Sequence, residues 1–310
     1  MSQRVPPFPT TALVFILAAA SSMAGDWPKD YVVQKSSESP DGRYVLLVQT
    51  ADAADAQTSN ESNVYLADVK AHTTLGTIEK VDYFEHQNHR GLEIYWAPDS
   101  SYCVVENDGR YGMDTLLVLE IKDSKFTQTE IGERIQKSLD SAMKVEGDVS
   151  AHFRPGDDRK IRVRATSQNN PKQFENVKTY YALFQGTYDL AAKKWTVTDA
   201  RRTNSDQDDA FQEAYNDDFT KHMIVAAEDK NVPEDFAGSI FRSEEEKFDA
   251  LDTQLNQVYL AVRTLLPANR FAKIKQEQIL WVKTRGAAKS VEEKSNLTTS
   301  RIRALQDLLW

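Results

Sequence analysis

The sequence predicts an α+β protein in which a β-rich N-terminal domain of repeated hairpin units precedes a C-terminal unit of three helices. Three observations lead to this fold class. Turns that contain proline recur at nearly equal spacing before strand-like segments, the spacing of apolar residues becomes helical after Ser243, and a strongly acidic stretch separates the two patterns. With 310 residues, the chain is long enough for two domains.

The repeated units are defined by turns at Pro40, Pro98 and Pro155, whose prolines are 58 and 57 residues apart. Proline followed by Asp or Gly favours a tight turn, and the β-branched and aromatic residues after each turn favour a strand. A recurrence of this length is typical of propeller blades or repeated sheet modules. Three units are too few to close an ordinary propeller of about 4–8 blades. We therefore expect propeller-blade-like hairpin units over residues 26–203, with one helix at 131–144; the alternative is that the spacing is coincidental.

An acidic stretch over residues 204–242 follows these units. Residues 205–240 carry a net charge of −8, against −9 for the whole chain. Phe211, Tyr215 and Phe219 recur every fourth residue, which predicts a helix. We therefore expect a solvated connecting helix and linker between two domains of small net charge.

The C-terminal part of the chain has the apolar period of helices. Ser243 and Glu246 have the spacing of a capping box. The apolar positions after them share one helix face: Phe248, Leu251, Leu255, Val258, Tyr259, Val262 and Leu266. Pro267 ends this helix, and we expect a second helix over residues 268–293 and a third over 297–310. The short links favour antiparallel neighbours, so these helices should form one compact unit.

Residues 1–24 have the features of a secretory signal peptide. Arg4 precedes an apolar run over Ala12–Ala20, and Ser22 and Ala24 provide the small residues of a cleavage site. The run is shorter than the about 20 residues that a membrane-spanning helix needs. We therefore expect cleavage near Ala24, a periplasmic or secreted protein, and no membrane span in the mature chain. A disordered tail or a membrane anchor is the alternative.

The composition excludes several classes of function. A net charge of −9 and a pI near 5.2 argue against nucleic acid as a partner. Cys103 is the only cysteine, which excludes an intramolecular disulfide, and its apolar neighbours predict a buried strand. Glu85, His86 and His89 could converge on a metal, but this spacing is a weak signal without a third histidine close by, and we expect a solvated loop before Gly91. Because common nucleophile, phosphate-loop and zinc motifs are absent from the sequence, we expect no cofactor, no metal and no enzymatic activity.

Three helical segments carry a family pattern. They are Leu251–Tyr259 (LDTQLNQVY), Gln278–Arg285 (QILWVKTR) and Thr299–Leu305 (TSRIRAL). With these segments, residues 243–310 resemble the LprI-like lysozyme-inhibitor domain family. The family commonly has cysteines that flank these motifs and an acidic residue at the position of Gly286, and this chain has neither.

The resemblance implies an exported bacterial protein that binds a lysozyme or another envelope protein, and inhibits by covering the cleft of the enzyme. Its motifs mark six candidate binding residues: Asp252, Asn256, Tyr259, Gln278, Trp281 and Arg285. Asp252 and Asn256 lie one helical turn apart, and so do Trp281 and Arg285, so these residues could instead lock the helices together. The alternative function is a non-inhibitory periplasmic protein that binds a ligand or partner through its β-rich domain.

Overall fold

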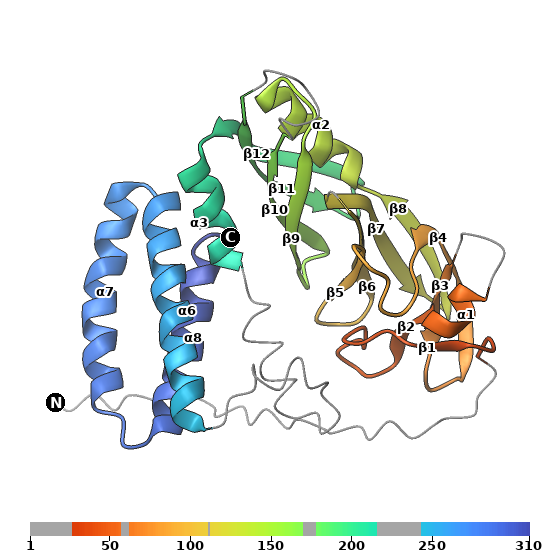
Figure 1. Cartoon of the computed structure of the whole chain (residues 1–310), viewed down its shortest axis with the longest axis horizontal. Helices are drawn as coiled ribbons and strands as arrows, with labels where there is room; N and C mark the ends of the chain where they lie inside the picture. The colour runs from red at the N-terminus through yellow and green to blue at the C-terminus, as the bar shows by residue number, and fades with distance from the viewer. Residues whose placement is uncertain (1–26, 57–61, 111, 170–177, 216–242) are drawn as a thin grey trace.

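The computed structural model describes residues 27–56, 62–110, 112–169, 178–215 and 243–310. Twelve strands occupy the N-terminal part of this described chain, and the longest helices follow them (Figure 1). The predicted α+β class, with a β-rich N-terminal part and C-terminal helices, is confirmed.

The strands form three antiparallel sheets of four, and in each sheet the strands are neighbours in chain order. The first sheet contains β1 Tyr31–Val33, β2 Tyr44–Gln49, β3 Asn63–Asp68 and β4 Thr73–Asp82. The second contains β5 Gly91–Trp96, β6 Tyr102–Gly109, β7 Gly112–Lys122 and β8 Lys125–Glu130. The third contains β9 Asp148–Pro155, β10 Lys160–Gln168, β11 Tyr181–Asp189 and β12 Lys194–Thr203.

Each of the three proline turns joins the first strand of its sheet to the second. Neighbouring units are also linked at these turns. The backbone N–H of Asp41 donates to Ser100 Oγ at 3.2 Å, and the Tyr102 hydroxyl donates to the Gly156 carbonyl oxygen at 2.6 Å. The proline turns that recur in the sequence therefore occupy the same position in each of three sheets, and these sheets pack one on the next.

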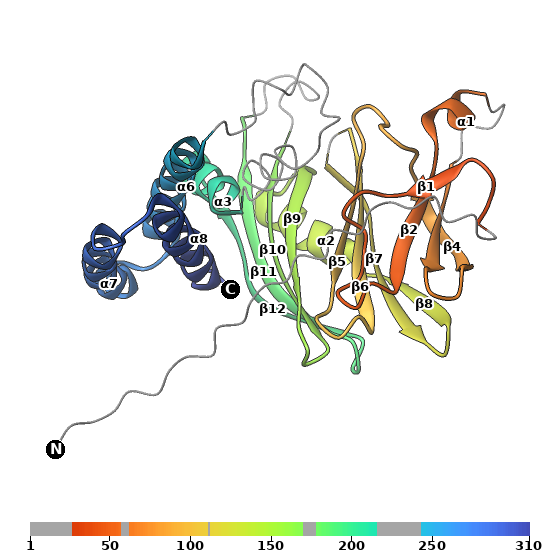
Figure 2. The same cartoon turned by 90° about the horizontal axis from the view of Figure 1, so that it is seen from below.

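The sheets stack face to face, with apolar cores between them (Figure 2). Side chains alternate along β6, so that Cys103 and Val105 pack towards the first sheet while Tyr102 and Val104 pack towards the third. Helix α2 (Gly132–Met143), close to its predicted position, packs its buried face into the core between the second and third sheets. Cys103 is fully buried, as predicted, and burial raises the pKa of its thiol.

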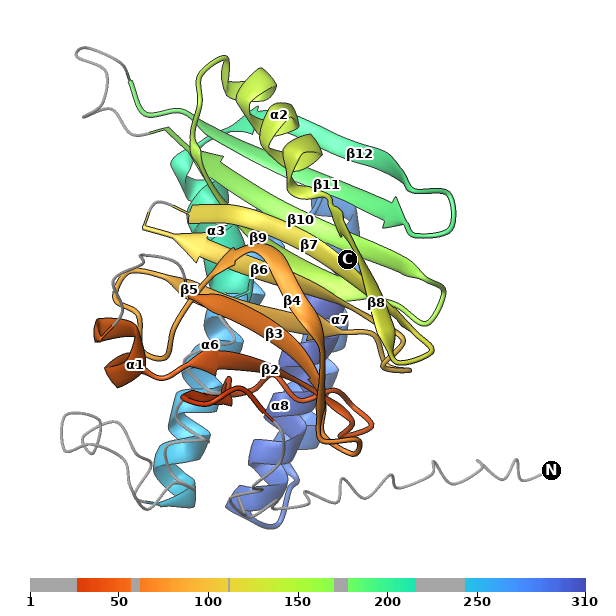
Figure 3. The same ribbon diagram turned by 90° about the vertical axis from the view of Figure 1, so that its right-hand side faces the viewer.

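Helices cover the outer face of the third sheet and extend beyond it (Figure 3). Besides α1 (Ala51–Asp55) and α2, the described helices are α3 Ser205–Tyr215, α6 Glu244–Leu265, α7 Ala268–Gly286 and α8 Val291–Asp307. Leu183 of β11 shares a core with Phe211 of α3 and with Leu255 and Leu305 of α6 and α8. Helix α7 is the outermost element, and Ile274 is its one buried residue.

The boundaries of the C-terminal helices were predicted partly correctly. Ser243 Oγ accepts a hydrogen bond from the N–H of Glu246 at 3.2 Å, so the predicted capping box is present. The prediction of one helix over 268–293 is wrong, because α7 ends at Gly286. Ser290 then begins α8 by the same device, with its Oγ accepting from the N–H of Glu293 at 3.1 Å.

Several predicted segments lie outside the described residues. These are the signal peptide over residues 1–24 and most of the connecting segment, including Phe219. The described part of that connection is α3, which forms where the acidic helix was expected. Within the described chain, no helix has both the length and the apolar character needed to cross a membrane.

Two glycines provide a matched test of this packing. Gly112 begins β7 at φ +106°, and a Cβ there would lie 2.6 Å from the carbonyl oxygen of Val149 on β9, whereas nothing lies within 4 Å of a Cβ at Gly286. We expect Gly112→Ala to lower the free energy of unfolding by about 1–3 kcal/mol. Gly286→Ala should leave it unchanged or raise it by about 0.5–1 kcal/mol, because alanine favours the helix.

Urea unfolding of both variants measures these changes. Equal stability of Gly112→Ala and the parent protein would contradict the close approach of β7 to β9.

Candidate functional site

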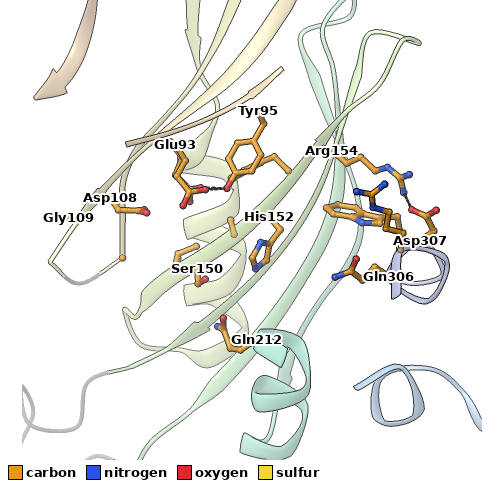
Figure 4. Close-up of a pocket in the computed structure, with 17 residues that line it drawn as sticks. Glu93, Tyr95, Asp108, Gly109, Ser150, His152, Arg154, Gln212, Gln306 and Asp307 are labelled. Carbon is orange, nitrogen blue, oxygen red and sulfur yellow. Dashed lines mark hydrogen bonds and ion pairs between the residues drawn. The ribbon is translucent and has the colours of Figure 1, made fainter. Parts of the chain in front are cut away.

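A groove of 880 Å³ lies where the second and third sheets meet helices α3 and α8 (Figure 4). We call it the acidic groove. Its wall is formed by residues of β5, β6, β9, α3 and α8, by the first residue of β7 and by Trp310, which follows α8: Glu93, Tyr95, Glu106, Asp108, Gly109, Gly112, Val149, Ser150, Ala151, His152, Phe153, Arg154, Gln212, Arg303, Gln306, Asp307 and Trp310. The site therefore depends on strands and helices that are far apart in the sequence.

The acidic end is formed by neighbouring residues of β5 and β6. Glu93 and Glu106 are register partners across these strands, so their side chains project from the same face. Tyr95 Oη donates a hydrogen bond to Glu93 Oε2 at 2.5 Å and lies 3.3 Å from Glu106 Oε2. Asp108, two residues further along β6, lines the same groove and is the third carboxyl at this end.

Burial, together with the charges of neighbouring carboxyls, makes Glu106, Asp108 and the Tyr95 phenol hard to ionise. Burial raises the pKa of Glu106 well above its usual range, and the charges of Asp108 and Glu93 raise it further. Burial, with the charges of Glu93 and Asp114, raises the pKa of Asp108 to about 6. Burial also raises the pKa of the Tyr95 phenol. A cation that entered the groove would remove this repulsion and favour the ionised carboxylates.

The other end of the groove joins the third sheet to the helices. Arg154 of β9 forms an ion pair with Asp307 of α8 at 2.8 Å. Gln306 Nε2 donates to the carbonyl oxygen of Ala214, at the end of α3, at 3.0 Å. These contacts hold α8 in place over the strand.

The edge of β9 forms the floor between the two ends. Six consecutive residues, Val149–Arg154, line the groove. Val149, Ala151 and Phe153 point into the core between the sheets, and the alternate residues face the helices. Residues from both faces of β9 therefore border the groove.

The six residues predicted from the family pattern lie elsewhere, within the helical unit. Arg285 Nη1 of α7 forms an ion pair with Asp252 Oδ1 of α6. The Arg285 guanidinium also lies 4.8 Å from the centre of the Trp281 ring and 5.5 Å from that of Phe248. This geometry joins α7 to α6 by charge and by cation–π contact.

The remaining predicted residues are arranged similarly. Gln278 Oε1 accepts a hydrogen bond from Arg301 Nε of α8 at 2.8 Å, and the rings of Tyr259 and Phe271 are 5.2 Å apart. Asn256 is exposed on α6. None of the six lines the acidic groove.

Sequence reasoning did not find the groove residues. One signal was present, because Glu106 directly follows the apolar run Cys103–Val105 in a strand expected to be buried. A charged residue in such a position needs a partner or a function. The pairing with Glu93 could not be read from the sequence, since it depends on the register of two strands.

The possible metal ligands Glu85, His86 and His89 form no metal site. His86 Nε2 lies 3.7 Å from Glu85 Oε1, and the side chain of His86 is exposed. Among the residues that the structure describes, no group of three or more His, Cys, Asp or Glu is arranged to hold a metal ion.

Comparisons with known proteins are weak. No family model matches the chain. No curated protein matches it. The complex of the fission yeast SREBP-SCAP binding domains is similar at 13% identity over 66% of this chain and 46% of that chain, with a TM-score of 0.28. The tricorn protease is similar at 10% identity over 89% of this chain and 29% of that chain, with a TM-score of 0.26.

The chain thus spans less than half the length of either structure. Superposition at these TM-scores assigns neither a fold family nor a function.

Because the pKa of Asp108 is raised, replacing this residue should raise the free energy of unfolding by an amount that depends on pH. Native Asp108 holds its proton up to about pH 6, whereas an unfolded aspartate ionises near about pH 4. The native state therefore loses stability as the pH rises through this window. Asp108→Asn should raise the free energy of unfolding by about 1–2 kcal/mol at neutral pH, and the gain should vanish in stronger acid.

Urea unfolding at several pH values checks this expectation. Glu79→Gln on β4 is the control, because that side chain is exposed and lies outside the groove. If the gain in the free energy of unfolding of Asp108→Asn did not depend on pH, the raised pKa of Asp108 would not be its cause.

The ion pair of Arg285 predicts a structural role for the family motif. Arg285→Ala should lower the free energy of unfolding by about 1–3 kcal/mol, because it leaves Asp252 without its partner and removes the contact with Trp281. Lys283→Ala, on the same turn but exposed, should change it by less than about 0.5 kcal/mol. Circular dichroism during urea unfolding measures both. If the Arg285→Ala variant is as stable as the parent chain but no longer binds the protein partner, the role of this arginine is recognition instead.

Proposed function

We propose that this chain is an exported protein of the bacterial envelope that binds a basic protein partner in the acidic groove and performs no chemistry of its own. The observation that carries the proposal is the cluster of Glu93, Glu106 and Asp108 at one end of the groove. Burial, and after it the charges of neighbouring carboxyls, raises the pKa of Glu106 and of Asp108. A lysine or arginine side chain of a partner is the kind of group that would relieve this repulsion.

A lysozyme is the first candidate for that partner. Residues 243–310 resemble the LprI-like lysozyme-inhibitor domain, and α6, α7 and α8 would be its three helices. Lysozymes are basic proteins, which suits the acidic groove, and the molecule would act by covering the cleft of the enzyme. Export rests on the sequence of residues 1–24, and we interpret the three sheets as propeller-blade-like units.

The second candidate is a non-inhibitory binding protein of the periplasm. The position of the groove favours it, because the carboxylates come from β5 and β6 and the floor from β9. In this case the β-rich part selects the partner, and the helices close one side of the site.

Lysozyme turnover with and without the purified mature chain separates the two candidates. We expect inhibition that falls by at least about tenfold in the double variant Glu93→Gln/Asp108→Asn, since removing charges from a binding site costs more than about 1.4 kcal/mol. Glu79→Gln should inhibit like the parent protein, because its exposed side chain lies outside the groove.

Calorimetric titration with the same lysozyme completes the test. Binding without inhibition would favour the second candidate. Neither binding nor inhibition at a large excess of the chain would reject lysozyme as the partner.

A further inference from the structure

Helix α7 is the outermost element of the molecule, and little of it is covered by other elements (Figure 2). Ile274 is its one buried residue, whereas α6 buries six. We propose that the outward side of α7 binds the surface of an anionic lipid membrane, with the helix lying parallel to the bilayer. This inference goes beyond the proposed function, because it concerns where the molecule is held and uses no residue of the acidic groove.

The outward side of α7 carries exposed apolar side chains. Ile279, Leu280 and Val282 are 45%, 64% and 47% exposed. They are three of the five large apolar residues that are exposed in the described chain, and a fourth, Leu260, lies on the neighbouring helix α6. Exposed apolar side chains that gather in one place mark a surface that binds a partner or a membrane.

Positive charge is concentrated around these side chains. Residues 260–289 contain seven lysines and arginines and one acidic residue, Glu277, in a chain whose net charge is −9. Lys275 and Lys283 are both exposed, and they lie one helical turn before and one after Ile279, along the same side of α7. Lysine stems cover apolar surface while their ammonium groups reach outwards. A helix surface that is both apolar and basic is complementary to anionic lipids.

The side chains of α7 favour a membrane over another protein. Its aromatic residues, Phe271 and Trp281, pack inwards against the core of the helical unit, so they do not project as anchors for a protein interface. Neither the acidic groove nor a second pocket of 320 Å³ at the start of α8 includes a residue of α7. A bilayer needs no such recess to receive exposed side chains. A second copy of the chain would bring two basic surfaces together, which costs free energy.

Co-sedimentation of the purified mature chain with lipid vesicles tests the proposal. Vesicles of phosphatidylcholine and phosphatidylglycerol in equal amounts are compared with vesicles of phosphatidylcholine alone. We expect the chain to bind the anionic vesicles at least about tenfold more tightly, because the lysines attract the charged headgroups. Added salt should weaken this binding.

Two variants separate the apolar from the basic contribution. Ile279→Gln/Leu280→Gln removes apolar side chains that would enter the lipid interface, and Lys275→Gln/Lys283→Gln removes two positive charges. Each should weaken binding to the anionic vesicles by at least about tenfold. Circular dichroism checks that both variants are folded, as expected for substitutions of exposed residues.

The matched controls lie on the first two sheets. Val33→Gln replaces the fifth exposed apolar residue, on β1, and Lys122→Gln/Lys125→Gln removes two exposed charges beside the turn between β7 and β8. Both controls should bind the anionic vesicles like the parent chain.

A fluorescent label identifies the side of the molecule that meets the bilayer. Because Cys103 is fully buried, a thiol-reactive, environment-sensitive fluorophore on the variant Leu280→Cys reports on α7. The same label on Val33→Cys is its control. We expect the emission of the label at position 280 to shift to shorter wavelength when anionic vesicles are added, and that of the label at position 33 to stay unchanged.

The outcomes are distinct. Weaker binding of both α7 variants, together with a shift confined to the label on Leu280→Cys, would support the proposal. No binding to anionic vesicles, or equal binding by the parent chain and the α7 variants, would overturn it. Displacement by polyglutamate at matched charge, with no effect of Ile279→Gln/Leu280→Gln, would overturn it in favour of an acidic protein. A dimer that this variant dissociates, in the absence of vesicle binding, would overturn it in favour of a second copy.

The proposed function is tested separately. The α7 variants should bind and inhibit lysozyme like the parent chain, because none of the substituted residues lines the acidic groove. Failure of vesicle binding would therefore leave the proposed function unchanged, and failure of lysozyme binding would leave the membrane surface unchanged.

Discussion

The architecture depends on one constraint, which is that the second and third sheets are apolar on both faces. Along β6, six residues in succession from Tyr102 to Asn107 are buried, and their apolar side chains alternate between two cores. A sheet of this kind needs a cover on each side. The first sheet covers one face of the second, and the third covers the other. The stack must then end, and it ends in helices on the outer face of the third sheet.

The same constraint produces the groove. Covering the faces of sheets does not cover their edges, and β5 and β9 are the first strands of their sheets. Helices α3 and α8 pack on the face of the third sheet and meet the strands at Arg154 and Asp307. A gap along the inner edges is left between them. The carboxyls that line it are costly to bury, since Glu106 is almost fully enclosed and its contact with the Tyr95 hydroxyl comes from its own sheet. Such a cost is typical of functional sites rather than of stable cores.

Features with a local cause could be predicted from the sequence, and those set by tertiary contacts could not. The turns at Pro40, Pro98 and Pro155 depend on a few adjacent residues, so their spacing correctly marked the repeated sheets. The cap at Ser243 was found for the same reason. The equivalent cap at Ser290 was missed, because the helical period was extended across Gly286. Glu93 and Glu106 are brought together by strand register, and β9 by the packing of sheets, so no pattern in the sequence could assemble the site.

The helical unit affects the groove through position rather than through its own motif residues. Arg285 holds α7 against Asp252 of α6, and Gln278 of α7 holds Arg301 of α8. These contacts orient α8, and α8 in turn presents Gln306 and Asp307 to α3 and β9. The strands, rather than the helices, supply the carboxyls Glu93, Glu106 and Asp108 of the groove. The helices thus close one side of the groove, and residues of β5, β6 and β9 line the other.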